Sequence, residues 1–136
     1  MSVKIIIRDL EKPAEKNLDK DIEWLCESLG FYEKIDREKT AAAIFKALLQ
    51  SQTRQKELTS TTIGSESKVT RGAALNHLHR MINAGLVIKK GTRYAVRCSN
   101  LHTTITELHR DIDQIFQDME DIAKEIDDRM GIKRRE

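Results

Sequence analysis

Three side chains that could hydrogen-bond to the edges of bases fall on a predicted helix near the middle of the chain. In "TRGAALNHLHRMINAG", residues 70–85, Asn76 and Arg80 lie opposite the apolar positions, and Arg71 is at the start of the helix. Arginine can make two hydrogen bonds to guanine, and asparagine two to adenine, in a DNA major groove about 12 Å wide that admits one helix. The face therefore fits double-stranded DNA, and an ordinary solvated helix face is the alternative for the same residues.

The rest of this segment predicts how such a helix begins, packs and ends. Thr70 is a suitable N-cap residue, and Gly85 is a typical C-terminal stop. The small residues Gly72 and Ala73 stand at the beginning of the polar face, where they would allow a close approach to a large partner. On the opposite side we expect the core-facing residues Ala74, Leu75, Leu78, Met81 and Ile82, with His77 and His79 at the borders and Asn83 on the polar side.

A short hairpin is predicted directly after this helix. Leu86 and Val87 return the chain to the core, and "IKKGTRYAVR" forms two strands around Gly91. The tip carries Lys89, Lys90 and Arg93. Cations on a hairpin next to a helix that fits the major groove can bind the flanking phosphates or enter the minor groove.

The charge of the chain is segregated along the sequence. The net charge is only +2, but between Lys46 and Arg97 there are 10 lysines and arginines against 2 acidic residues, which gives +8. The segments on either side are acidic, at −2 before Lys46 and −4 after Arg97. A basic centre between acidic flanks indicates a localised surface for a polyanion.

Residues 36–98 resemble winged helix-turn-helix DNA-binding domains, particularly ArsR/MarR-like regulators of archaea and bacteria. The match rests on "TRGAALNHLHRMINAGLV" as recognition helix, "IKKGTRYAVR" as wing and "KTAAAIFKALLQ" as first helix. The resemblance implies that Thr70, Arg71, Asn76 and His77 contact bases or backbone. The sequence departs from the family at "QKELTSTTIGSESK", which lacks the usual alanine-rich pattern; there Leu58 and Ile63 would anchor a short helix closed by Gly64.

Further elements are predicted towards the N-terminus. "SVKIIIRDL" favours a short strand from Val3 to Arg8, and residues 17–29 form a helix ended by Gly30. Trp24 beside its apolar face is interpreted as a packing residue. Asp36 is the expected N-cap of the next helix, whose buried stripe is Ile44, Phe45, Leu48 and Leu49, and which "SQTRQ" ends.

The C-terminal segment carries the most regular periodicity. Apolar residues recur there in alternating steps of four and three, which is a heptad seam that must be covered by another helix. The N-terminal helix could cover about half of it, which leaves apolar surface for a second chain. We therefore expect a homodimer, held by Leu101, Ile105, Leu108, Ile112, Ile115, Met119, Ile122 and Ile126.

Other classes of site are not indicated. His102 and His109 are one heptad apart, not at the four-residue spacing that suits a helical metal pair, and no motif frames a nucleophile or binds a nucleotide phosphate. Cys26 and Cys98 have no disulfide or metal-site spacing, and no apolar run is long enough for a membrane span. We expect no enzyme activity, cofactor, metal or membrane contact, and a cytoplasmic location.

These observations give one set of expectations. The fold class is mainly α (α+β), a winged helix-turn-helix domain at 36–98 between an N-terminal part at 1–35 and a C-terminal helix at 99–136, both used for dimerisation. The function is sequence-specific transcriptional regulation on double-stranded DNA; the alternative is a protein-interaction or scaffold module. The small-molecule effector stays unknown. The expected DNA-binding residues are Lys68, Thr70, Arg71, Asn76, His77, Arg80, Lys89, Lys90 and Arg93.

Overall fold

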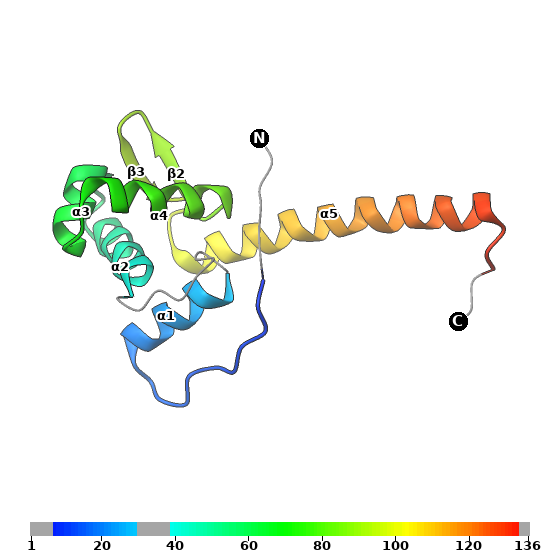
Figure 1. Ribbon diagram of the computed structural model, residues 1–136, viewed down its shortest axis with the longest axis horizontal. Helices are drawn as coiled ribbons and strands as arrows, with labels where there is room; N and C mark the ends of the chain where they lie inside the picture. Colours follow the sequence, from blue (N-terminus) through cyan, green and yellow to red (C-terminus); the bar gives the residue numbers. More distant parts are fainter. Residues whose placement is uncertain (1–6, 30–38, 134–136) are drawn as a thin grey trace. The chain divides into compact units, whose positions relative to one another are not determined.

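The chain is mainly helical with a small antiparallel sheet, an α+β architecture (Figure 1). The computed structural model describes residues 7–29 and 39–133. Two compact units divide between Thr104 and Ile105, so the predicted N-terminal and central parts belong to one unit. The elements are α1 (Leu18–Ser28), α2 (Thr40–Thr53), β1 (Leu58–Thr59), α3 (Ser60–Ser67), α4 (Arg71–Asn83), β2 (Val87–Lys90), β3 (Arg93–Val96) and α5 (Leu101–Met130).

The predicted helix at residues 17–29 is confirmed as α1. The Asn17 side chain accepts a hydrogen bond from the Lys20 amide at 3.1 Å and caps the helix. The helix ends at Ser28 with Leu29 as its C-cap, and Gly30 lies outside the described residues. Most of the predicted strand 3–8 also lies outside them; its described residues, 7 and 8, are not in a strand.

Helix α2 differs from its prediction at both ends. Its N-cap is Lys39, in the left-handed conformation with φ 57°, and the predicted cap Asp36 lies outside the described residues. The helix continues to Thr53, and within its last turns the hydroxyls of Ser51 and Thr53 donate to the carbonyls of Leu48 and Gln50. It stops just before Gln55, which has φ 54°.

The core of the N-terminal unit is built around α2. This helix contacts α1, α3, α4 and β3. These neighbours together bury the apolar side chains of α2, which is the favourable contribution of the hydrophobic effect. Leu49 is only half-buried, but the other three residues of the predicted stripe are fully buried. The largest fully buried side chains include Ile44, Phe45, Leu48, Ile63, Leu78, Met81 and Leu86.

The segment before α4 is where the sequence prediction was wrong. Leu58 belongs to β1 and not to the short helix, and Gly64 lies inside α3 instead of closing it. Thr59 caps α3 through its hydroxyl, which accepts from the Thr62 amide at 3.2 Å. The helix is ended by Lys68, whose φ is 59°.

The sheet has the order β1-β3-β2, and both pairings are antiparallel. Gly91, with φ 59°, turns the predicted hairpin β2–β3, which is confirmed. Gly85, with φ 81°, ends α4 as predicted: its amide donates to the Ile82 carbonyl, and the Leu86 amide donates to the Met81 carbonyl. Leu86 is thereby turned into the core, where it is fully buried.

The predicted heptad segment is one continuous helix, α5. Along its seam Leu108 is buried, whereas Leu101, Ile105 and Ile112 are half-buried. From Ile115 onward the apolar side chains are exposed in the single chain. Among the described residues, no helix is both long enough and apolar enough to cross a bilayer.

Replacing Gly64 with alanine should destabilise the fold, although alanine is normally the better helix former. A Cβ at Gly64 would lie 2.9 Å from the carbonyl oxygen of Val69, a backbone atom that cannot move without shifting the turn. We expect a loss of about 1–3 kcal/mol in the free energy of unfolding, measured by urea denaturation. Gly72→Ala in α4 is the matched control, since nothing lies within 4 Å of its Cβ. Equal stability of both variants would contradict the close contact.

Candidate nucleic-acid interface

Helices α3 and α4 form a closely packed pair joined by a short turn. The Val69 amide donates to the Gly64 carbonyl at 2.9 Å, and Gly64 has no room for a side chain against this turn. Thr70 caps α4 as predicted, because its hydroxyl accepts from the Ala73 amide at 3.1 Å. These backbone contacts fix where α4 begins relative to α3.

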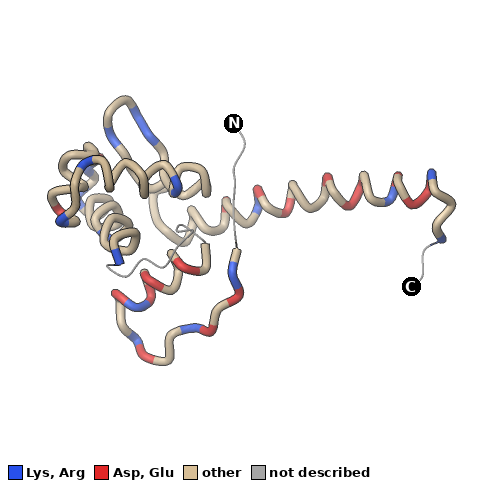
Figure 2. The backbone as a smooth tube through the Cα atoms, viewed as in Figure 1, with Lys and Arg blue, Asp and Glu red and all other residues tan. Residues whose placement is uncertain are grey.

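The two sides of α4 divide as the sequence predicts. Ala74, Leu78 and Met81 are buried, and Leu75 and Ile82 are half-buried. On the opposite side Gly72, Asn76, His79, Arg80 and Asn83 are exposed, and Ala73 is half-buried. Basic residues lie on α4 and on the neighbouring hairpin (Figure 2). The exposed side of α4 is thus a polar surface with two small residues, asparagines and an arginine, and no acidic residue.

Arg71 makes a hydrogen bond inside the protein, and His77 is partly buried. The Arg71 guanidinium donates from Nε to the Ser60 hydroxyl at 3.1 Å, which ties the start of α4 to the start of α3. His77 is half-buried and its Nδ1 atom is inaccessible to solvent, so this side chain lies at the edge of the polar surface. Arg71 keeps its terminal nitrogens for a further partner, whereas His77 presents only part of its ring.

The cations of the hairpin are held by neighbouring groups. The Lys90 ammonium lies 3.6 Å from the Glu57 carboxylate, and the Arg93 guanidinium donates to the Glu57 carbonyl at 3.1 Å. Lys89 lies over the ring of Tyr94, 5.8 Å from its centroid. The three side chains are exposed, so they can exchange these partners for phosphate oxygens.

Sequence reasoning did not assign any role to Glu57. One signal was present, because Glu57 and Glu66 are the two acidic residues of the basic segment 46–97. The contact itself depends on β1, which pairs Leu58 with Tyr94 and Thr59 with Arg93 and so brings Glu57 beside the hairpin. Because β1 was predicted as helix, this pairing was not foreseen.

Lys68, the remaining predicted contact residue, is exposed at the turn between α3 and α4. It therefore lies next to Thr70 and the N-terminus of α4, where backbone amides and a cation together favour an anion such as phosphate. The structure brings Lys68, Thr70 and Arg71 together at this turn, and places Asn76 and Arg80 further along the same helix.

The histidine and cysteine side chains of the described residues lie apart from this surface or singly on it. Among them, no group of three or more histidine, cysteine, aspartate or glutamate side chains could hold a metal ion. His109 is exposed and lies 3.5 Å from Asp113 on the same helix, and His102 is exposed at its start. Cys26 is a buried free thiol and Cys98 a half-buried one.

Arg71 should contribute to stability through Ser60, independently of any ligand. Comparing Arg71→Ala, Ser60→Ala and the double variant by urea denaturation should give a coupling free energy of about 0.5–1.5 kcal/mol, the net value of one hydrogen bond. Arg80→Ala with Ser60→Ala is the control cycle, since no contact joins this pair among the described residues. Coupling that is absent in the first cycle, or equal in both, would rule out the bond in solution.

Comparison with known proteins adds no relative to these observations. No protein-family model, no curated protein and no solved structure matches the chain. The geometry and charge of the α3–α4 pair and of the hairpin are therefore the grounds on which a function can be assigned.

Proposed function

We propose that the chain is a winged helix-turn-helix protein that binds double-stranded DNA sequence-specifically and regulates transcription as a homodimer. The observation that carries the proposal is the combination of an exposed polar face on α4 with a cationic hairpin, both attached to one core. In this assignment α4 enters the major groove, and the β2–β3 hairpin contacts the phosphates beside it.

The three parts of the surface have different tasks. Asn76 and Arg80 are the exposed side chains of α4 that can make paired hydrogen bonds to base edges. Lys68 and the α4 N-terminus position the helix on a phosphate, and Lys89, Lys90 and Arg93 add contacts that depend little on sequence. Arg71 orients α4 through Ser60 and offers its terminal nitrogens to the DNA.

A protein-interaction or scaffold module is the competing function. A scaffold requires the same core but has no use for a polar α4 face free of acidic side chains beside an exposed cationic hairpin. Selection of bound duplexes from a random pool separates the two functions. We expect enrichment of a two-fold-symmetric site with half-sites about 34–36 Å apart or a multiple of that spacing, as helix-turn-helix dimers require. If the selected duplexes share no enriched sequence, the result would contradict sequence-specific binding and favour the scaffold function.

Asn76→Ala should relax base preference without removing DNA binding. A bidentate asparagine–adenine contact accounts for about 1–3 kcal/mol of discrimination, so this difference between the selected site and its single-base variant should disappear. Competition binding measures the difference directly. Lys89→Ala is the control, because loss of a phosphate contact should weaken all sequences alike. An unchanged preference in Asn76→Ala would show that this face of α4 does not read bases.

Glu57→Gln should strengthen DNA binding at every sequence, because Lys90 then no longer pairs with a carboxylate. A partly exposed ion pair contributes about 0.5–1 kcal/mol, so we expect about a two- to five-fold gain in affinity at moderate salt. Glu120→Gln, on the exposed surface of α5, changes the net charge equally and is the matched control. Titration of labelled duplex at several salt concentrations compares them, and equal gains would show that only net charge matters.

The homodimer in this proposal is formed by α5. Ile115, Met119, Ile122 and Ile126 are between 47% and 57% exposed in the single chain, and Phe116 at 55% widens the same stripe. Such a continuous apolar stripe is unfavourable in water and is normally covered by another helix. Because the stripe uses three heptad positions, it fits a multi-helix core better than a two-stranded seam.

Ile115→Asp combined with Ile122→Asp should convert the protein to a monomer. Both side chains are exposed in the single chain, so the substitutions remove association without disturbing the core. Sedimentation at micromolar concentration should show the change, and the affinity for a two-fold-symmetric site should fall with it. Asp113→Asn together with Glu120→Gln, on the polar side of α5, should leave the dimer intact. A wild-type protein that is already monomeric, or a double variant that stays dimeric, would exclude this interface.

A further inference from the structure

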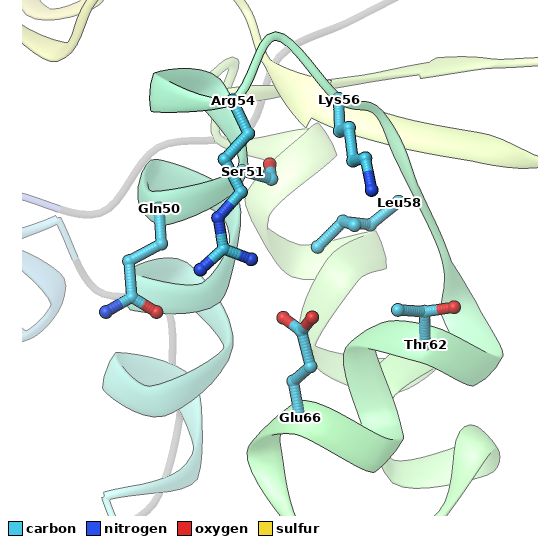
Figure 3. Close-up of a pocket in the computed structure, with 7 residues that line it drawn as sticks. All are labelled: Gln50, Ser51, Arg54, Lys56, Leu58, Thr62 and Glu66. Atoms are coloured by element: carbon cyan, nitrogen blue, oxygen red, sulfur yellow. The ribbon is translucent and has the colours of Figure 1, made fainter.

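A pocket with opposing charges lies between α2, β1 and α3 (Figure 3). It is formed by the last turn of α2, the residues that lead into β1, and one face of α3. Its volume is about 360 Å³, at the small end of ligand pockets, which span about 300–1,000 Å³. All of its lining residues belong to the N-terminal unit: Gln50, Ser51, Arg54, Lys56, Leu58, Thr62 and Glu66.

The two walls of the pocket carry charges of opposite sign. Arg54 and Lys56 extend into the pocket from the side of α2 and the chain that follows it, whereas the Glu66 carboxylate points into it from α3. Within the described part of the chain, none of these three side chains makes an ion pair or hydrogen bond with another residue. Ionic groups that converge without neutralising one another are suited to a ligand that supplies both signs of charge.

Both cations extend from the short segment that joins α2 to β1. Gln55, between them, has φ 54°, a left-handed conformation that costs a non-glycine residue free energy and directs Arg54 and Lys56 to the same side. The conformation is fixed by hydrogen bonds from the Gln55 amide to the Gln52 carbonyl and from the Lys56 amide to the Ser51 carbonyl, both at 3.0 Å. These hydrogen bonds fix the backbone from which the Arg54 and Lys56 side chains extend.

The remaining lining residues give the pocket a floor and a polar side. Leu58 is only 7% exposed and provides apolar surface. Thr62 is one helical turn before Glu66, so the two side chains lie on the same face of α3. The Thr62 hydroxyl accepts from the Thr59 hydroxyl at 3.0 Å, and among the described residues its own proton has no acceptor, so it can donate to a ligand. A short aliphatic chain with charged groups at its ends matches this arrangement.

We infer that this pocket binds a free acidic α-amino acid, a molecule with two carboxylates and one ammonium group. The charges are complementary one by one: the carboxylates pair with Arg54 and Lys56, the ammonium group pairs with Glu66, and the methylene carbons rest on Leu58. Arginine suits the first role because its guanidinium binds a carboxylate through two parallel hydrogen bonds. The inference concerns the ligand of this pocket and does not depend on DNA binding.

Calorimetric titration of the full chain with L-glutamate tests the inference in the absence of DNA. Glutarate, which has the same two carboxylates but no ammonium group, should bind about ten-fold more weakly than glutamate, because Glu66 then faces a ligand without a matching charge. Glu66→Gln should lose this preference for glutamate. Arg54→Gln should weaken both ligands about ten-fold or more.

Controls separate the pocket from general charge effects and from the proposed function. Glu120→Gln and Arg110→Gln remove the same charges from exposed positions on α5, and glutamate binding should be unchanged in both. Because the altered pocket side chains are exposed, the variants should keep the wild-type circular dichroism spectrum. No saturable binding of glutamate at concentrations on the order of 10 mM, or equal binding of glutamate and glutarate by the wild type, would overturn the inference whether or not the chain binds DNA.

Discussion

The close contact of Gly64 with the turn after α3 is the constraint on which the candidate interface depends. The Gly64 carbonyl accepts from the Val69 amide, and the Val69 carbonyl occupies the place of a side chain on Gly64. This backbone contact sets the distance between α3 and the start of α4. The Thr70 cap and the Arg71–Ser60 hydrogen bond then act on a helix that is already positioned.

The basic segment contains two acidic residues, and the fold uses them in different ways. Glu57 lies beside the hairpin and holds Lys90 through its carboxylate and Arg93 through its carbonyl. Glu66 faces two cations across an open pocket. In the first case opposite charges are paired beside the hairpin. In the second case they are not paired with each other, so each can form an ion pair with a charged group of a ligand. The net charge of +8 conceals both arrangements.

Acidic and apolar side chains divide the surface of α5 between them. The exposed apolar stripe from Ile115 to Ile126 is flanked by Asp111, Asp118 and Glu125 at one edge. In the proposed dimer the apolar residues supply the association free energy, and the carboxylates keep this helix from competing for the phosphates that the basic unit is proposed to bind. In the proposed function, segregation of charge between parts of one chain gives each part a different partner.

Local chemistry in the sequence was sufficient to determine several elements. Thr70 as N-cap, Gly85 as C-terminal stop, the hairpin around Gly91 and the helical seam that becomes α5 depend on a few neighbouring residues and were predicted from them. The apolar stripe of α4 likewise specified which of its residues would be exposed, because helical periodicity alone divides buried from exposed positions.

Only the tertiary structure decided where long-range contacts override local preference. Gly64 resembles a helix stop in sequence but lies inside α3, because the backbone of the following turn fills the space beside it. Leu58 favours helix locally, yet it pairs with Tyr94 in the sheet. Glu57 accepts a hydrogen bond from Arg93, 36 residues later, and Arg54 and Lys56 line the same pocket as Glu66. Such contacts are set by how elements pack, and no short window of sequence contains both partners.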